Sequence, residues 1–240
     1  MKKTIALAMA GLTIGLGVMS VKADDRSWEW SPLGIGIAAP IQLPFMESDV
    51  YGLRIGGFCG YNYDVYGIDA GIVEVAEHNF GGIQASAFSW TEGNAYGLTV
   101  APLATVIGGD SVALQAAFAN VVWSDGAGIQ LGVINRDNAF AGIQFAGIIN
   151  WNEMGSAGFE VSPINDNQAE FDGLAIGALI NHTATMRGCQ IGLFNTAYQA
   201  TGYQLGIFNA CDTMHGVQFG LVNIIADSKL PFMLIANASF

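Results

Sequence analysis

The chain has 240 residues, of which 52% are hydrophobic, 12% are charged and 32 are glycine. The formal net charge of −12 excludes the basic surface that nucleic-acid-binding proteins need, so we expect no nucleic-acid partner. The charged fraction is about half that of an ordinary globular protein, yet so many glycines are atypical of helices that span membranes.

The N-terminal segment has the pattern of a secretory signal peptide. Two lysines precede an uncharged apolar run over residues 5–18, and Val21-Lys22-Ala23 then offers a cleavage site. The apolar run is too short for a membrane anchor. We therefore predict a signal peptide over 1–23 and a single repeat-built β domain over 24–240. Its removal would leave five basic against 20 acidic residues, a net charge of −15.

An eight-residue phrase recurs along most of the chain. Its order is Gly, apolar, Gln, apolar, Gly, apolar, apolar, Asn, which we number positions 1 to 8. Weaker copies extend the array over about residues 52–237 at intervals of 14–16 residues, and such regularity indicates one structural unit copied many times. The clearest copies are 128–135 (GIQLGVIN), 188–195 (GCQIGLFN), 202–209 (GYQLGIFN) and 216–223 (GVQFGLVN).

Alternation of apolar with Gly or Gln residues within each phrase predicts a β-strand, so the chain should be all-β. A straight strand of eight residues spans about 26 Å, and the other six residues of the period reach at most ~20 Å. A β-solenoid with coils of 14–16 residues therefore requires a bend within the phrase, for which the glycine at position 5 is a plausible corner. An up-and-down antiparallel meander requires no such bend and is favoured.

Two less regular apolar segments, 33–43 and 231–240, flank twelve phrases. The resulting total of about 14 strands is even, as in bacterial single-chain membrane barrels. We therefore predict a closed barrel of the outer-membrane type, in which the apolar side chains meet lipid and the Gly and Gln residues line a lumen. The alternative is the β-solenoid.

The last strand also favours a barrel. A C-terminal Phe with apolar residues at every second position resembles the assembly signal of outer-membrane barrels, although an ordinary apolar strand would look the same. The resemblance implies outer-membrane lipid and the barrel-assembly machinery as partners. The residues concerned are Phe232, Leu234, Ala236, Ala238 and Phe240.

Beyond this strand, the chain resembles an uncharacterised family of exported bacterial surface-repeat proteins over about residues 32–240. The resemblance rests on the phrases, on Pro40-Ile41-Gln42-Leu43, on the segment from Val50 to Ile55 and on the ending from Pro231 to Phe240. It is specific over 128–223 and looser over 67–120, where Pro102 and Ala117 replace the second glycine. It implies export and a location in the cell envelope, and it supplies no reaction, ligand or functional residue.

No motif for catalysis is present: there is no Gly-x-Ser-x-Gly elbow, no phosphate-binding glycine loop and no His-Glu-x-x-His helix. We therefore expect no enzyme, no catalytic residue, no cofactor and no metal. The histidines His78, His182 and His215 lie between phrases and are interpreted as exposed turn residues.

Acidic residues form two loose groups. Asp64 and Asp69 could bind a divalent cation at one rim, but together with Glu74 and Glu77 they are better explained as a solvated rim. The segment Asp166–Asp172 is interpreted in the same way.

The Gln at position 3 is the most repeated polar side chain. We interpret it as a structural ladder of stacked amides, with a Gln-lined passage for small polar solutes as the functional alternative. The Asn at position 8 is interpreted as a turn former. The three cysteines, Cys59, Cys189 and Cys211, cannot all pair and are assigned to packing, with a disulfide or metal role as the alternative.

Two functions are consistent with these features. The first is a non-enzymatic envelope protein, an outer-membrane barrel with a structural or weakly selective channel role. The alternative is a secreted or surface-attached β-solenoid that acts as an adhesion or interaction surface.

Overall fold

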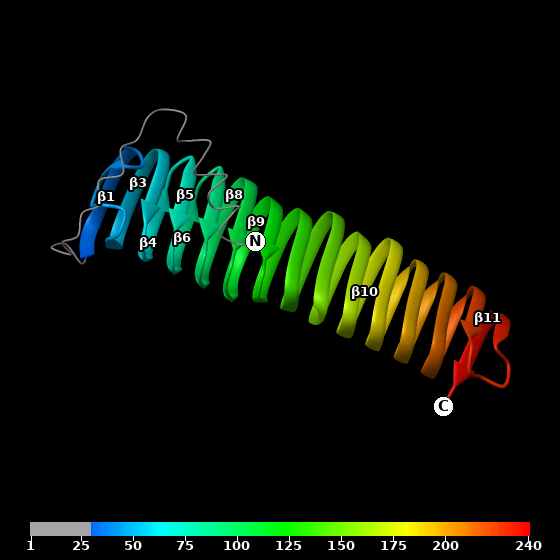
Figure 1. Cartoon of the computed structure of the whole chain (residues 1–240). Coiled ribbons are helices and arrows are strands. Elements are labelled where there is room, and N and C mark those ends of the chain that lie inside the picture. The colour runs from blue at the N-terminus through cyan, green and yellow to red at the C-terminus, as the bar shows by residue number, and fades with distance from the viewer. Residues whose placement is uncertain (1–29) are drawn as a thin grey trace.

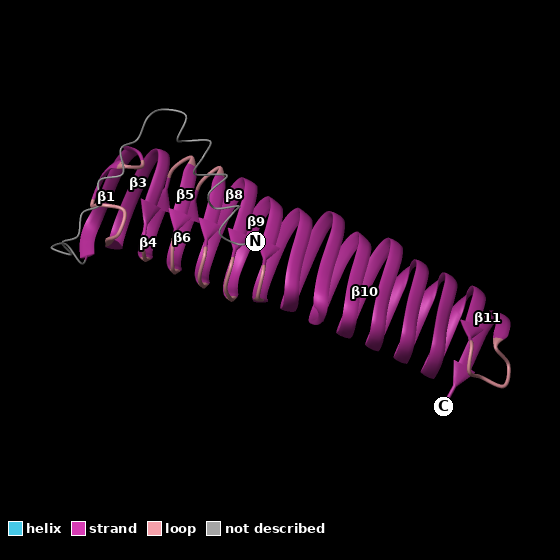
Figure 2. Cartoon of the chain, in the orientation of Figure 1, coloured by secondary structure: helices cyan, strands magenta, loops and turns pink. Residues whose placement is uncertain are grey.

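A computed structural model describes residues 30–240, which form a long stack of coils built almost entirely from β-strands (Figures 1 and 2). The predicted signal peptide lies outside the described residues. Within 30–240 no helix is long and apolar enough to cross a membrane. The prediction of an all-β chain is confirmed.

Eleven strands belong to one sheet. They are β1 (Trp30–Ala38), β2 (Ile41–Leu43), β3 (Asp49–Asn62), β4 (Val65–Ala70), β5 (Val73–Ala76), β6 (Phe80–Ala85), β7 (Phe88–Thr91), β8 (Ala95–Ile107), β9 (Ser111–Val122), β10 (Asp125–Ile225) and β11 (Phe232–Ser239). The 101 residues of β10 wind through many coils without a break in the strand assignment.

Successive coils pair in parallel and in register, so that equivalent positions of the phrase stack on one another. Gly52 pairs with Gly67, and Gly67 with Gly82. Likewise, Gln115 pairs with Gln130. Parallel pairing contradicts the predicted antiparallel meander, and the 14-stranded barrel is therefore wrong. The fold is the alternative, a β-solenoid with one phrase in each coil.

The bends explain why the estimate of chain reach favoured the wrong architecture. In the coil 188–201 the buried side chains alternate with exposed ones except at 193–194, at 198–199 and around Gly202, where neighbouring residues both point outward. These three places turn the chain. The first lies inside the phrase, directly after the position-5 glycine, so the phrase is not a straight strand and the coil closes within 14 residues.

Both ends of the stack carry strands that depart from the repeat. At the N-terminal end, β1 pairs in parallel with β3 and in an antiparallel direction with β2. At the other end, β11 runs antiparallel along the last coil, with Gln218 paired to Asn237. The C-terminal strand is thus the last strand of the solenoid sheet, and its interpretation as a barrel assembly signal is wrong.

A ladder of Asn side chains runs through the interior at position 8. The Asn195 amide donates from Nδ2 to Asn209 Oδ1 over 2.8 Å and also to the carbonyl oxygen of Leu205 over 2.9 Å. Equivalent amide-to-amide bonds join successive coils from Asn120 to Asn223. All of these Asn residues except Asn165 also donate to a backbone carbonyl oxygen of the next coil or of β11.

A second ladder is formed by Gln side chains at position 3, and its bonds run the opposite way. Gln218 Nε2 donates to Gln204 Oε1 of the preceding coil over 2.8 Å, and Gln204 donates to Gln190 over 2.9 Å. The Gln side chains are at most 1% exposed. Because they fill the interior in mutual contact, the structural interpretation of the Gln is confirmed and they line no passage.

The two glycines of the regular phrase make room for this interior. A Cβ on Gly206 at position 5 would lie 2.5 Å from Asn195 Nδ2, so the amide occupies the space of a side chain. At position 1, Gly202 has a φ of +124°, and its Cβ would lie 2.0 Å from the carbonyl oxygen of Gly188. Glycine is therefore favoured at Gly206 by close packing and at Gly202 by the backbone conformation.

Apolar packing in the interior is confined to the remaining columns. The residue two places before each position-1 glycine is inward and is often large, as with Phe171 and Met186, which are fully buried. These side chains join others in one cluster near the C-terminal end and a second near the N-terminal end. The interior is thus a mixture of amide ladders and apolar columns.

Candidate interaction surface

The apolar residues of the phrase point outward. The outward side chains at positions 2, 4, 6 and 7 of successive coils form one continuous surface along the stack, which we term the apolar face. Leu131, Phe145 and Phe219 on this surface are 40–48% exposed. Position 2 is occupied by Leu53, Ile68, Ile83, Leu98, Leu114, Ile129, Ile143, Phe159, Leu174, Cys189, Tyr203 and Val217.

No charged residue occupies the apolar face between Leu53 and Val222. Outward charges lie at the other two bends and on the sides that join them, as Glu92, Arg136 and Asp212 do. The same segregation extends to the N-terminal end, because Leu33 and Ile35 of β1 stack on Leu53 and Ile55. The solenoid therefore has one charge-free side and an acidic remainder.

The size of the apolar face follows from the geometry of the sheet. Leu53 and Val217 are 164 residues apart, which at 14–16 residues per coil amounts to about eleven coils. At ~4.8 Å per coil and ~16 Å across positions 2 to 6, the face covers about 800 Å². Monomeric soluble proteins rarely expose an apolar patch larger than a few hundred Å², and larger ones usually mark binding sites.

Contacts between coils hold the larger side chains of this face in place. Phe145 meets Phe159 of the next coil edge to face, with 5.8 Å between the ring centroids. Phe194 and Phe208 at position 7 approach to 6.1 Å. In-register stacking of a rigid sheet therefore gives the apolar face a regular surface.

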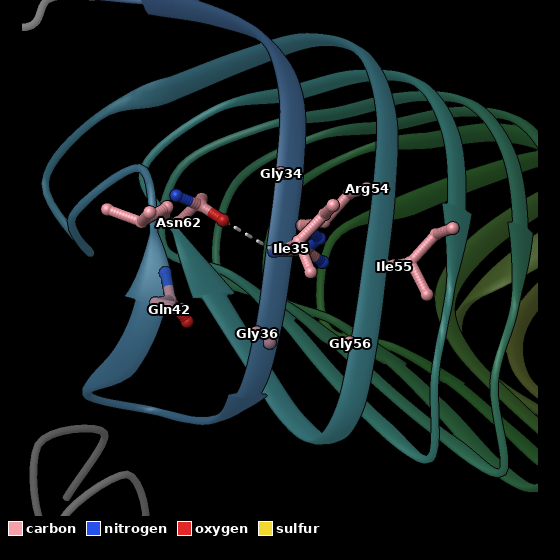
Figure 3. A pocket seen from close by; sticks show the side chains of 10 residues that line it. Gly34, Ile35, Gly36, Gln42, Arg54, Ile55, Gly56 and Asn62 are labelled. Carbon is pink, nitrogen blue, oxygen red and sulfur yellow. Dashed lines mark hydrogen bonds between the residues drawn. The ribbon is translucent and has the colours of Figure 1, made fainter.

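A cluster of buried charges lies inside the first coils. Arg54 donates from Nε and Nη2 to the two carboxylate oxygens of Asp69, each over 2.7 Å, and its Nη2 lies 3.0 Å from Glu74 Oε2. A further hydrogen bond, over 3.4 Å, reaches Asn62 Oδ1 (Figure 3). Arg54 and Asp69 occupy position 3, where other coils have Gln. Glu74 occupies position 8, where other coils have Asn, and it pairs with Gly60 of the preceding coil. Charged side chains therefore replace the amides of both ladders in these coils.

The surroundings of this cluster are closed. Glycines at 56, 60 and 71 surround the Glu74 carboxylate so tightly that a Cβ on any of them would lie within about 2.1 Å of it. The adjacent cavity, lined by Arg54, Asn62 and Gln42, has a volume of about 10 Å³, room for about one water molecule. Burial raises the pKa of Glu74 to about 8, against the opposing effect of Arg54. The arrangement neutralises charge inside the stack and offers no access to a substrate.

A second buried acidic group interrupts the ladders near the middle of the array. Glu160 occupies a position-3 slot and accepts hydrogen bonds from Asn152, Asn167 and Ser156. Burial raises its pKa to about 7, although the bonds from Ser156 and Asn167 oppose the rise. Asp137 accepts from Gln130 and Gln144 over 2.8 Å each, and burial likewise raises its pKa.

The structure separates the acidic residues that the sequence grouped together. Asp69 and Glu74 are fully buried, so their interpretation as a solvated rim is wrong. Asp64 instead lies at an outer bend, where His78 Nδ1 approaches its Oδ1 to 3.1 Å. Asp64 and Asp69 therefore do not meet in one cation site. Within residues 30–240 no group of three His, Cys, Asp or Glu is placed to hold a metal ion.

The other singled-out side chains have ordinary surroundings. Glu170 and Asp172 share an exposed ion pair with Arg187. His215 is exposed, whereas His182 is partly covered and its Nδ1 lies 2.9 Å from Thr196 Oγ1. All three cysteines are free, with Cys211 buried and Cys59 and Cys189 half-buried.

One prediction about the phrase was wrong. The Asn at position 8 is a buried ladder residue and not a turn former, and Ile235 is the only non-glycine residue of the described chain with positive φ. Sequence reasoning also missed the Arg54 cluster. Arg54 and Asp69 carry opposite charges, and both occupy position 3 of successive phrases, 15 residues apart. If parallel stacking is assumed, this spacing predicts the ion pair between them.

The chain matches no protein-family model, no curated protein and no solved structure.

Proposed function

We propose that this protein is a non-enzymatic interaction protein that binds its partner through the apolar face. The observation that carries the proposal is the complete absence of charge from positions 2, 4, 6 and 7 along the array, on a rigid surface of about 800 Å². Apolar side chains stacked on the outside of a fold, with amides inside, reverse the usual distribution of residues, and burial against a partner accounts for that reversal.

The remaining features agree with this proposal. The buried carboxyl groups of Asp137 and Glu160 are enclosed by their own hydrogen-bond partners, and that of Glu74 is enclosed by Arg54 and by tightly packed glycines, so we interpret all three as structural. The resemblance to exported surface-repeat proteins and the signal-peptide pattern suggest that the interaction takes place outside the cytoplasm. We propose export and a surface location as part of the same function.

Cys189 provides a probe for this proposal, because it lies on the apolar face at position 2. We expect its alkylation by a water-soluble maleimide to be about tenfold slower in the native setting, the producing cells and their medium, than in purified protein diluted to nanomolar concentration, at which a bound partner separates. The protein should carry Cys59→Ala, which leaves Cys189 and the buried Cys211.

The matched control is a Thr201→Cys, Cys189→Ala variant, since Thr201 is exposed on the other side of the position-1 bend. Its alkylation should proceed at one rate in both settings. Alkylation of Cys189 that is equally fast in the two settings, at the rate of the Thr201→Cys control, would show that nothing covers the face and would refute the proposed function.

A further inference from the structure

The apolar face is suited to a particular occupant, and we infer that this is a second copy of the same chain, bound face to face about a twofold axis. The inference rests on the proposed function and specifies the partner. It follows from three observations: the area of the face, its composition, which is complementary to a second copy of itself, and the location of the charged residues on the other sides of the solenoid.

The area agrees with what a stable dimer needs. Specific protein interfaces bury roughly 800 Å² on each partner, and the interfaces of permanent homodimers are the more apolar ones. The apolar face supplies about 800 Å² over about eleven coils. A small ligand or a short peptide would leave most of this length exposed.

The composition makes the face complementary to itself. In a twofold interface the same patch appears on both sides, so it must contain nothing that is repelled by its own copy. A charged column would face a like charge, but positions 2 and 4 contain none along the array. Two sheet faces of Ile, Leu, Val and Phe pack at about 10 Å, as the two halves of a β-sandwich do.

Electrostatics also favours this side of the molecule over the others. The formal net charge of −12 would oppose the association of two copies through most of the surface. The outward acidic residues, such as Glu92 and Asp212, lie at other bends and would remain in solvent in a face-to-face dimer. Association through the apolar face thus keeps like charges apart.

The ends of the stack do not offer an equivalent surface. Successive coils pair in parallel, but at the C-terminal end this pairing stops at β11, which runs antiparallel to the last coil. At the N-terminal end β2 reverses direction against β1. Side-by-side packing is therefore the geometry that extends along the whole array.

The test is the mass of the purified protein in solution, measured by sedimentation equilibrium between 1 and 100 µM. We expect twice the mass of one chain. Leu131→Lys, at position 4 in the middle of the array, should weaken association by about 100-fold, because each copy would bury an unpaired ammonium group in the interface. Gln168→Lys adds the same charge at an exposed bend and is the control, with the mass of the native protein.

Both variants should keep the far-ultraviolet circular dichroism spectrum of the native protein, since neither side chain points into the interior. A native protein that sediments as a single chain at 100 µM, with no difference from Leu131→Lys, would overturn the inference. Flotation of such a monomer with phosphatidylcholine vesicles, abolished by Leu131→Lys, would assign the face to lipid instead.

The outcome for the second copy is separable from the outcome for the proposed function. If the purified protein is a monomer but Cys189 is still protected from alkylation in the native setting, the apolar face binds a different partner. That result would refute the dimer and leave the proposed function intact. A monomer with an unprotected Cys189 would refute both.

Discussion

Gln and Asn side chains are seldom fully buried in proteins, yet in this molecule they occupy both interior positions of the phrase in half of the twelve coils. Burial of an amide is unfavourable unless its donors and acceptor are satisfied, and a column of identical amides satisfies them by repetition. Each bond contributes about 1 kcal/mol, but an interrupted column leaves neighbouring groups unpaired at about 1–3 kcal/mol each. A single substitution should therefore cost more than one bond.

Asn195→Ala tests this coupling. The change removes the hydrogen-bond donor to Asn209 Oδ1 and to the Leu205 carbonyl oxygen, and it removes one of the two acceptors of Asn181 Nδ2, which keeps its bond to the Ile191 carbonyl oxygen. We expect the free energy of unfolding to fall by about 3 kcal/mol, measured by urea denaturation. Gln199→Ala, at an exposed site four residues away, should change it by less than about 0.5 kcal/mol. A loss below about 1 kcal/mol for Asn195→Ala would show that the ladder is not coupled.

Among the elements, β11 departs most from the regular geometry of the stack. It pairs antiparallel with the last coil, and its register shifts between the residues opposite Gly220 and Asn223. At Ile235, opposite Gly220, the backbone has a φ of 73°, a left-handed conformation that a β-branched residue adopts only with strain. The Ile235 side chain is 76% exposed, so packing does not compensate for that strain.

Ile235→Asn should therefore stabilise the protein. Asn tolerates the left-handed conformation better than Ile, so we expect the free energy of unfolding to rise by about 1 kcal/mol. The comparison is Leu234→Asn, which changes an exposed neighbour whose φ is not positive. If both variants unfold at the same denaturant concentration, the conformation at Ile235 is not a source of strain.

For the whole molecule, buried carboxyl groups link stability to pH. Burial raises the pKa of Glu160 to about 7 from an ordinary 4.5, and the pKa of Glu74 to about 8. In the folded state these groups keep a proton that the unfolded chain releases above about pH 4.5. The stability that these groups contribute is consequently full below about pH 4.5 and is lost as the pH rises to about 7 or 8. Repulsion among the surface carboxylates acts in the same direction.

Glu160→Gln should flatten this dependence, because it restores the amide that other coils have at position 3. A pKa of Glu160 raised from 4.5 to about 7 corresponds to a loss of ~2.5 kcal/mol between pH 5 and pH 8, which the variant should not show. Thermal or urea unfolding at the two pH values measures the difference. Glu92→Gln removes one carboxylate from an exposed bend and should retain the native pH dependence. A variant Glu160→Gln with unchanged dependence would refute the assignment.

The phrase in the sequence was enough to identify the strands, the period and the two sides of the sheet. Alternation assigned Gln to the enclosed side and the apolar residues to the outer side, and this assignment holds for a barrel and a solenoid alike. The Gln ladder was also predictable, because identical amides at one position of a repeat can satisfy one another wherever neighbouring strands align in register.

The tertiary structure decided how neighbouring phrases pair, since parallel or antiparallel pairing depends on where the chain bends between strands and not on alternation within them. The bend after the position-5 glycine shortens each phrase enough for a coil to close, and this removes the only objection that chain reach raised against the solenoid. Parallel stacking then brings residues 15 apart into contact, and so places Arg54 against Asp69. It also aligns the outward apolar residues into one uncharged face, which a single phrase does not reveal.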